Sequence, residues 1–119
     1  MNMARMLYII FIGWMILVTI GSLLPATSFP SWADLGGNRD KVAHFIAYFF
    51  TALLFYLAFR SRFKKTDIYA MIFAASYGAL LELVQLFVPG RDCSLGDLAA
   101  NLSGVLFFFF LYRILWGKL

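Results

Sequence analysis

Four long apolar stretches, separated by short polar segments, dominate the sequence. They cover about residues 6–24, 41–59, 68–88 and 95–115, and the first is uncharged over all 19 of its positions. Each has about the 20 residues that a helix needs to cross the hydrocarbon core of a bilayer. The pattern predicts four transmembrane helices, packed as an all-α, integral membrane four-helix bundle within a single domain, residues 1–119.

Proline, glycine and charged residues mark the breaks between these stretches. Pro25–Asp40 forms the one long loop, the basic run RSRFKK at 60–65 predicts a short turn, and Gly90–Gly96 predicts a compact one. Asp40 and Asp67 stand where the second and third helices are expected to begin. A carboxylate accepts from free N–H groups of a first helical turn, so both are predicted as N-caps.

The first apolar stretch has an alternative interpretation as a cleaved signal peptide. The preceding residues, MNMAR, are positive and Ala26 is small. The stretch is longer than a typical signal core, and three more apolar stretches follow, which favours a retained helix.

Composition supports lipid as the solvent for most of the chain. Hydrophobic residues make up 63% and charged residues only 13%, whereas a soluble domain has roughly a quarter charged. The single cysteine, Cys93, excludes an internal disulfide and a cysteine-rich metal site. The net charge of +4 lies in short runs between apolar stretches. This is the orientation pattern of a membrane protein and gives no reason to expect a nucleic-acid partner.

The ten basic residues divide unequally between the two ends of the predicted bundle. Cytoplasmic segments of membrane proteins carry an excess of Lys and Arg, which predicts a multi-pass protein with both termini cytoplasmic. The long loop then faces outward. Three basic residues, Arg39, Lys41 and Arg91, lie on the outer side. The other seven lie on the cytoplasmic side: Arg5, Arg60, Arg62, Lys64, Lys65, Arg113 and Lys118.

Polar side chains within the apolar stretches gather near the outer end of each. Positions three or four residues apart share a helix face, so each stretch presents its polar groups as a stripe. The stripes lie at similar depths below their own helix ends, because each residue adds about 1.5 Å of rise. This predicts one shared cluster in the outer leaflet, which consists of His44, Glu82, Gln85, Arg91, Asp97 and Asn101.

Three members of this cluster have both a chemical and a structural interpretation. Glu82 is costly at membrane depth, which favours binding or proton transfer, but it could be a structural partner of Arg91 or His44. His44, the only histidine, ordinarily titrates near neutrality, or it could form an interhelical hydrogen bond. Arg91 could grip a phosphate or carboxylate through two hydrogen bonds, or it could be a solvated loop residue.

The other polar and small residues have stronger structural interpretations. Asp97 stands at a helix start, where a carboxylate is favourable. Gln85 and Asn101 could join helices by hydrogen bonds, while Gly78 and Gly104 are expected at close helix contacts. One histidine with two acids at unknown separation is a weak metal pattern, so neither a metal nor another cofactor is expected.

Three segments resemble the VanZ-like family of small bacterial membrane proteins: DKVAHFIAYF (40–49), ELVQLFVPGRDCSLGD (82–97) and DLAANLSG (97–104). They are similar to the family's D-K-x-x-H-F, E-x-x-Q…P-x-R and D-x-x-x-N-x-x-G elements, in that order. The resemblance implies a compact four-helix protein of the bacterial envelope, with a multi-pass location in the inner (plasma) membrane. The family name comes from low-level teicoplanin resistance, which is a phenotype and not a reaction. The implied motif positions are Asp40, Lys41, His44, Glu82, Gln85, Arg91, Asp97, Asn101 and Gly104.

Two functions are consistent with these residues. The first is binding or modifying an anionic envelope lipid or cell-wall precursor from the outer leaflet. The second is a structural or accessory membrane subunit in which the polar residues form an interhelical network. A transporter ranks third, because four spans are few and the cytoplasmic half has little polar lining. In the first, Lys41 and Arg91 hold the anion, Glu82 and His44 accept and donate a proton in any reaction, and Asp40, Gln85, Asp97 and Asn101 orient the bound group.

Overall fold

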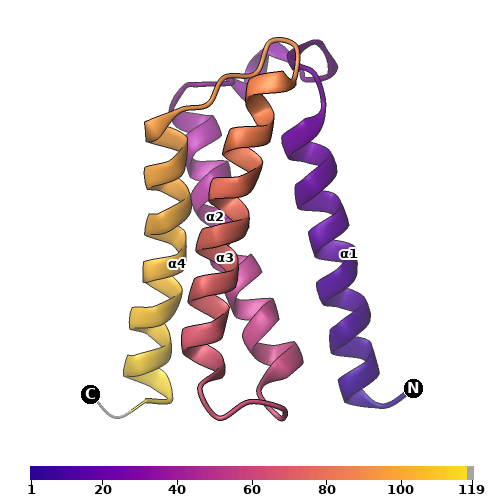
Figure 1. Cartoon of the computed structure of the whole chain (residues 1–119), viewed down its shortest axis with the longest axis vertical. Coiled ribbons are helices and arrows are strands. Elements are labelled where there is room, and N and C mark those ends of the chain that lie inside the picture. Colours follow the sequence, from indigo (N-terminus) through magenta and orange to yellow (C-terminus); the bar gives the residue numbers. More distant parts are fainter. Residues whose placement is uncertain (118–119) are drawn as a thin grey trace.

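The computed structural model of the chain describes residues 1–117, and within them four long helices stand side by side (Figure 1). They are α1 (Met3–Leu23), α2 (Asn38–Phe59), α3 (Thr66–Val84) and α4 (Leu95–Leu115). All four are long and apolar enough to cross a membrane, which confirms the predicted all-α architecture with four candidate spans.

The connections between the helices match the predicted breaks. The long loop contains two short 3-10 helices, Ala26–Ser28 and Ser31–Ala33, and α3 continues as a third, η3 (Gln85–Phe87). The start of α1 and the end of α4 lie at the same end of the bundle (Figure 1). The long loop and the turn between η3 and α4 lie together at the opposite end, where the Ala26 N–H donates to the Pro89 carbonyl at 3.1 Å.

Small residues bring α2, α3 and α4 into close contact. A Cβ atom added at Gly104 would overlap the carbonyl oxygen of Phe45 on α2 and lie 3.0 Å from the Phe49 nitrogen. A Cβ at Gly78 would lie 2.9 Å from the Tyr48 ring and 3.1 Å from the amide nitrogen of Asn101. Small residues let helices approach where no hydrophobic effect drives their association. The prediction that both glycines are packing contacts is confirmed.

Helix α1 packs chiefly against α2, through aromatic rings near the end where the chain starts. Phe11 is its one fully buried residue among those described. Its ring contacts the rings of Phe55, Phe59 and Phe73, with centroids 5.7 to 5.8 Å apart. Farther along α1, Trp14 donates from Nε1 to Thr51 Oγ1 at 3.0 Å. These contacts hold α1 on the three-helix core.

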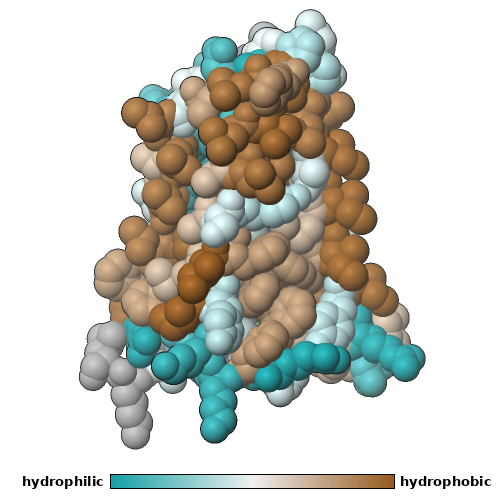
Figure 2. All heavy atoms as spheres, in the orientation of Figure 1, coloured by the Kyte–Doolittle hydropathy of each residue, from teal (hydrophilic) through white to brown (hydrophobic). Residues whose placement is uncertain are grey.

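The face of the bundle seen in Figure 2 is mainly hydrophobic along its length and hydrophilic at the end that carries the termini. At that end Arg113 of α4 pairs with Asp67 of α3 at 3.4 Å. Lys118, counted above among the basic residues of this side, lies outside the described residues. The described basic residues of this end are Arg5, Arg60, Arg62, Lys64, Lys65 and Arg113.

The predictions that Asp40 and Asp67 are N-caps are wrong. The cap of α2 is Gly37, and the helix begins three residues earlier than expected because Asn38 and Arg39 join its first turn. The cap of α3 is Lys65, so Asp67 is also inside a first turn. Both carboxylates still benefit from the positive end of a helix dipole, and both take other partners: Asp40 accepts from the Gly36 N–H at 3.1 Å.

Gly104→Ala is expected to separate α2 from α4, since the new methyl group would meet main-chain atoms that cannot rotate away. Overpacking of this kind costs about 1–3 kcal/mol. Gly13→Ala is the matched control, because apart from its chain neighbours and the nearby backbone of its own helix no described atom lies within 4 Å of a Cβ at that glycine. Thermal unfolding in detergent, followed by circular dichroism, measures both. Equal stability of the two variants would contradict the close α2–α4 contact.

Candidate functional site

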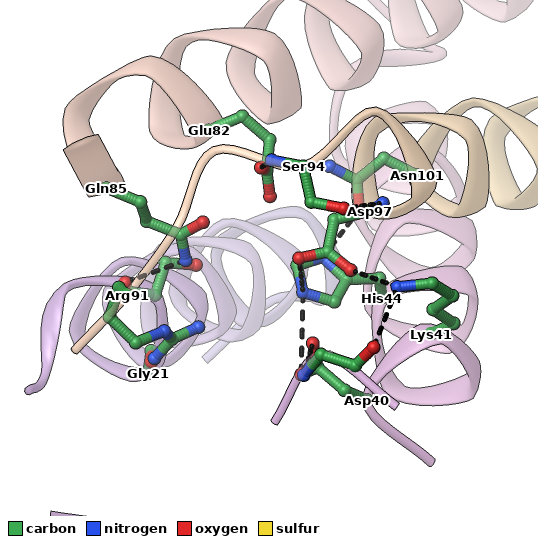
Figure 3. Close-up of polar contacts among 12 residues, drawn as sticks. Gly21, Asp40, Lys41, His44, Glu82, Gln85, Arg91, Ser94, Asp97 and Asn101 are labelled. Atoms are coloured by element: carbon green, nitrogen blue, oxygen red, sulfur yellow. Dashed lines mark hydrogen bonds and ion pairs between the residues drawn. The ribbon is translucent and has the colours of Figure 1, made fainter. Parts of the chain in front are cut away.

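The polar residues of α2 and α4 meet where these helices begin, at the end away from the termini (Figure 3). Asp40 lies in the first turn of α2 and Asp97 in the first turn of α4. The N-cap of α4 is Ser94, whose Oγ accepts from the Asp97 N–H at 3.2 Å. Unpaired N–H groups give each helix start a partial positive charge, so both carboxylates are placed favourably.

His44 lies between these two carboxylates (Figure 3). Its Nε2 is 3.6 Å from Asp40 Oδ1 and 3.7 Å from Asp97 Oδ2, and the imidazole is only 11% exposed. Its other nitrogen, Nδ1, is 2.8 Å from Asn101 Oδ1. Lys41 donates from Nζ to Asp97 Oδ1 at 3.0 Å. We call these five residues the α2–α4 cluster: Asp40, Lys41, His44, Asp97 and Asn101.

Glu82 of α3 is 3% exposed but binds a different group. Its Oε2 accepts from the Ser94 main-chain N–H at 3.0 Å. Neither Arg91 nor His44, the two partners considered from the sequence, is within hydrogen-bond distance of it among the described residues. Glu82 therefore holds the start of α4 against the end of α3.

Gln85 and Arg91 both bind the last turn of α1. Gln85 donates from Nε2 to the Ser22 carbonyl at 2.9 Å. Arg91 donates from Nη1 to the Gly21 and Leu24 carbonyls at 3.2 and 3.3 Å. Carbonyl groups at a helix end lack partners within the helix, so these side chains complete their hydrogen bonding. Arg91 also lies over the Phe29 ring, 5.1 Å from its centroid.

The structure thus divides the eight predicted site residues into three parts. Five residues form the α2–α4 cluster, Glu82 anchors the turn before α4, and Gln85 with Arg91 anchors α1. Sequence reasoning missed Ser94, although its position three residues before Asp97 is a helix-start pattern that could have revealed it. It also missed Gly36 and the α1 carbonyls, which carry no side-chain signal.

Two cavities reach the site from different directions. One of about 200 Å³ lies at the polar end, where the segment at 35–40 faces the turn at 90–97. The other, of about 210 Å³, lies between α1 and α2 and has mostly apolar walls, with His44 among them. Arg91 lines both cavities. The residues lining the first are Leu35, Gly36, Asp40, Gly90, Arg91, Asp92, Ser94 and Asp97.

Comparison with known proteins relates the whole bundle to one family. A family model described as VanZ/LLP1 matches residues 5–116. An uncharacterized protein of fission yeast (Schizosaccharomyces pombe), C11E3.10, is 37% identical over 67 residues, which are 56% of this chain and 41% of that protein. The chain therefore matches about two fifths of the relative's length. No solved structure matches.

Two substitutions of Glu82 distinguish how much its hydrogen bond and how much its charge contribute to stability. Glu82→Gln keeps an oxygen that accepts from the Ser94 N–H, whereas Glu82→Leu leaves that N–H without its acceptor. Loss of the partner of a buried donor costs about 1–3 kcal/mol. We expect unfolding in detergent to show Glu82→Leu destabilised by that amount and Glu82→Gln close to wild type. If both variants lost the same stability, the Ser94 bond would not be the reason.

Proposed function

The chain belongs to the VanZ/LLP1 family, and on this premise we propose that it binds the phosphate or carboxylate headgroup of an anionic membrane lipid or lipid-linked cell-wall precursor. The headgroup would enter the cavity at the polar end. Its apolar chain would stay in the membrane beside α1 and α2.

The position of Arg91 is the single observation that carries this proposal. Arg91 lines both the polar cavity and the apolar cavity between α1 and α2. Its hydrogen bonds to described residues all come from Nη1. A guanidinium has five N–H donors in a planar fork, so Nη2 and Nε retain donors for an anion. This combination suits an amphiphile, because the cation and the polar cavity can bind its anionic headgroup and the apolar cavity can bind its hydrocarbon chain.

The other predicted binding residues would contribute in different ways. Lys41 adds positive charge beside Asp97. For a reaction on the headgroup, His44 is better placed than Glu82 to move a proton, because His44 lines a cavity while Glu82 Oε2 is already bound to the Ser94 N–H. Asn101 would hold the imidazole in its orientation through Nδ1. Gln85 would act indirectly, by keeping α1 against the site.

We further propose that the protein lies in a bacterial plasma membrane, with both chain termini on the cytoplasmic side. The basic turn at 60–65 lies at the same end as the start of α1 and the end of α4, and cytoplasmic segments carry excess Lys and Arg. The polar cavity would then open in the outer leaflet. The bacterial origin is supported by the sequence resemblance, and the fission yeast relative indicates that similar chains also occur in eukaryotes.

A second candidate function, a structural or accessory subunit, is favoured by the extent of pairing at this site. Glu82, Gln85, Arg91 and Lys41 each bind another segment of the chain. A network of this kind joins helices in membrane bundles. The two functions differ in what Arg91 does with the donors that α1 does not use.

Arg91→Gln is expected to weaken binding of anionic lipid at least tenfold, because hydrogen bonds to charged groups contribute about 1.5–3 kcal/mol. Arg39→Gln is the matched control: it removes one exposed arginine at the same end, whose Nη1 donates only to the Trp32 carbonyl among the described residues. Native mass spectrometry from phosphatidylcholine nanodiscs would count bound phosphatidylglycerol or undecaprenyl phosphate, with inorganic phosphate as the ligand that lacks a lipid chain.

Thermal unfolding of the same samples separates the two functions. Arg91→Gln also removes the two hydrogen bonds to the α1 carbonyls, so some fall in the midpoint is expected under either function. Weaker lipid binding by the folded Arg91→Gln variant supports a headgroup site. A lower midpoint with unchanged lipid binding would favour the structural subunit.

A further inference from the structure

Three atoms of the α2–α4 cluster point toward one another without a hydrogen bond between them. They are Asp40 Oδ1, His44 Nε2 and Asp97 Oδ2, and one possible ligand atom from each of these three residues lies within 4.8 Å of the other two. The two carboxylate oxygens are 3.6 and 3.7 Å from Nε2, beyond ordinary hydrogen-bond length. The side chains of Asp40 and Asp97 are only 11% and 7% exposed.

The remaining polar atom of each side chain is held by a different partner (Figure 3). The Gly36 N–H donates to Asp40 Oδ2 at 3.1 Å, and Lys41 donates to Asp97 Oδ1 at 3.0 Å. Asn101 Oδ1 lies 2.8 Å from His44 Nδ1. An amide oxygen can only accept, so this contact puts a hydrogen on Nδ1, and in the neutral imidazole Nε2 then carries the lone pair. Each side chain is therefore held in orientation by a hydrogen bond at one polar atom, and its other polar atom faces the other two side chains.

A neutral imidazole in this orientation directs its lone pair at two carboxylate oxygens. This arrangement is repulsive unless positive charge lies between the three atoms. Lys41 compensates Asp97 from the other carboxylate oxygen, Oδ1. The electrostatics of the cluster thus favour a cation at the point where the three atoms converge.

The distances fit a small divalent metal. Zinc binds histidine nitrogen and carboxylate oxygen at about 2.1 Å, and two such ligands at tetrahedral to trigonal angles are about 3.4–3.6 Å apart. The 3.6 Å separation from Nε2 lies at the upper end of that range, and the 3.7 Å separation exceeds it by about 0.1 Å. A histidine ligand that donates its other N–H to an oxygen, as His44 does to Asn101, is typical of metal sites.

We propose that Asp40 Oδ1, His44 Nε2 and Asp97 Oδ2 bind a divalent transition-metal ion of the Zn²⁺ type. The imidazole nitrogen favours zinc or a similar metal over Mg²⁺ and Ca²⁺, which prefer oxygen ligands alone. Three protein ligands leave one tetrahedral position open, and the cavity of about 200 Å³ that Asp40 and Asp97 line gives it room. This site goes beyond headgroup binding and does not depend on it.

The first test measures Zn²⁺ alone against the full chain in an uncharged detergent, by calorimetry after removal of metals with a chelator. Asp97→Asn keeps the shape and an acceptor for Lys41 but removes a ligand charge. We expect the Zn²⁺ affinity to fall at least about 100-fold, beyond the 10–100-fold typical of losing a residue that only hydrogen-bonds a metal ligand. Asp92→Asn is the matched control, since it removes the same charge from an exposed residue of the same cavity, and should change affinity less than about threefold.

A second measurement needs no substitution. His44 is the only histidine of the chain, so in a protein without a histidine tag the imidazole ¹⁵N spectrum reports on it alone. Zn²⁺ should shift the Nε2 resonance strongly and leave Nδ1 protonated. This readout applies even if Asp97→Asn fails to fold.

Three outcomes would overturn the metal site: equal Zn²⁺ affinity in wild type and Asp97→Asn, an unshifted Nε2 resonance, or loss of binding in Cys93→Ser, which would assign the zinc to the exposed thiol. A doubly protonated imidazole that does not respond to Zn²⁺ would show that a proton supplies the positive charge instead. Because no anionic lipid is present, each result is independent of the Arg91 lipid-binding test.

Discussion

Polar groups within a membrane must find their partners inside the protein, because no water is available there to replace a missing hydrogen bond. The polar end of this bundle follows that constraint closely. Glu82 accepts from a main-chain N–H just before α4. Gln85 and Arg91 donate to main-chain carbonyls at the end of α1. The same side chains that satisfy these helix ends also determine where the ends lie. The arrangement of the four helices at this end therefore depends on a few buried polar contacts.

Close packing of α2 on α4 determines which polar residues can meet. Gly104 lies against the Phe45 carbonyl, next to His44 in the chain. Asn101 lies three residues before Gly104, and Asp97 lies seven residues before it. All three residues therefore share one face of α4. A contact at the glycine thus brings Asn101 and Asp97 opposite His44 and Asp40. A larger residue at Gly104 would act on the cluster as well as on stability, since it would move the whole face.

The sequence predicted the helices well, and also the gathering of polar residues at one end of the bundle, for a physical reason. Bilayer thickness limits the length of each apolar stretch, and helical periodicity places residues such as Asp97 and Asn101 on one face. The partners were harder to predict because many are main-chain atoms. Nothing in the sequence indicates that Arg91 binds the Gly21 carbonyl or that Glu82 binds the Ser94 N–H. The same limit explains the helix starts, since Asp40 and Asp67 suit a first turn as well as a cap.

The charges at the polar end connect the two proposed ligands. The cavity there is lined by three carboxylates, Asp40, Asp92 and Asp97, and by one guanidinium, that of Arg91. An anionic headgroup entering this cavity meets more negative than positive charge, with Lys41 already paired to Asp97. A divalent ion held by Asp40, His44 and Asp97 would reverse that balance, because a bound metal is often the largest local charge in its site. Its open coordination position would face the same space as the free donors of Arg91. Cation and anion would then each make the binding of the other more favourable, which gives the acidic residues of this cavity a role in holding a negatively charged lipid.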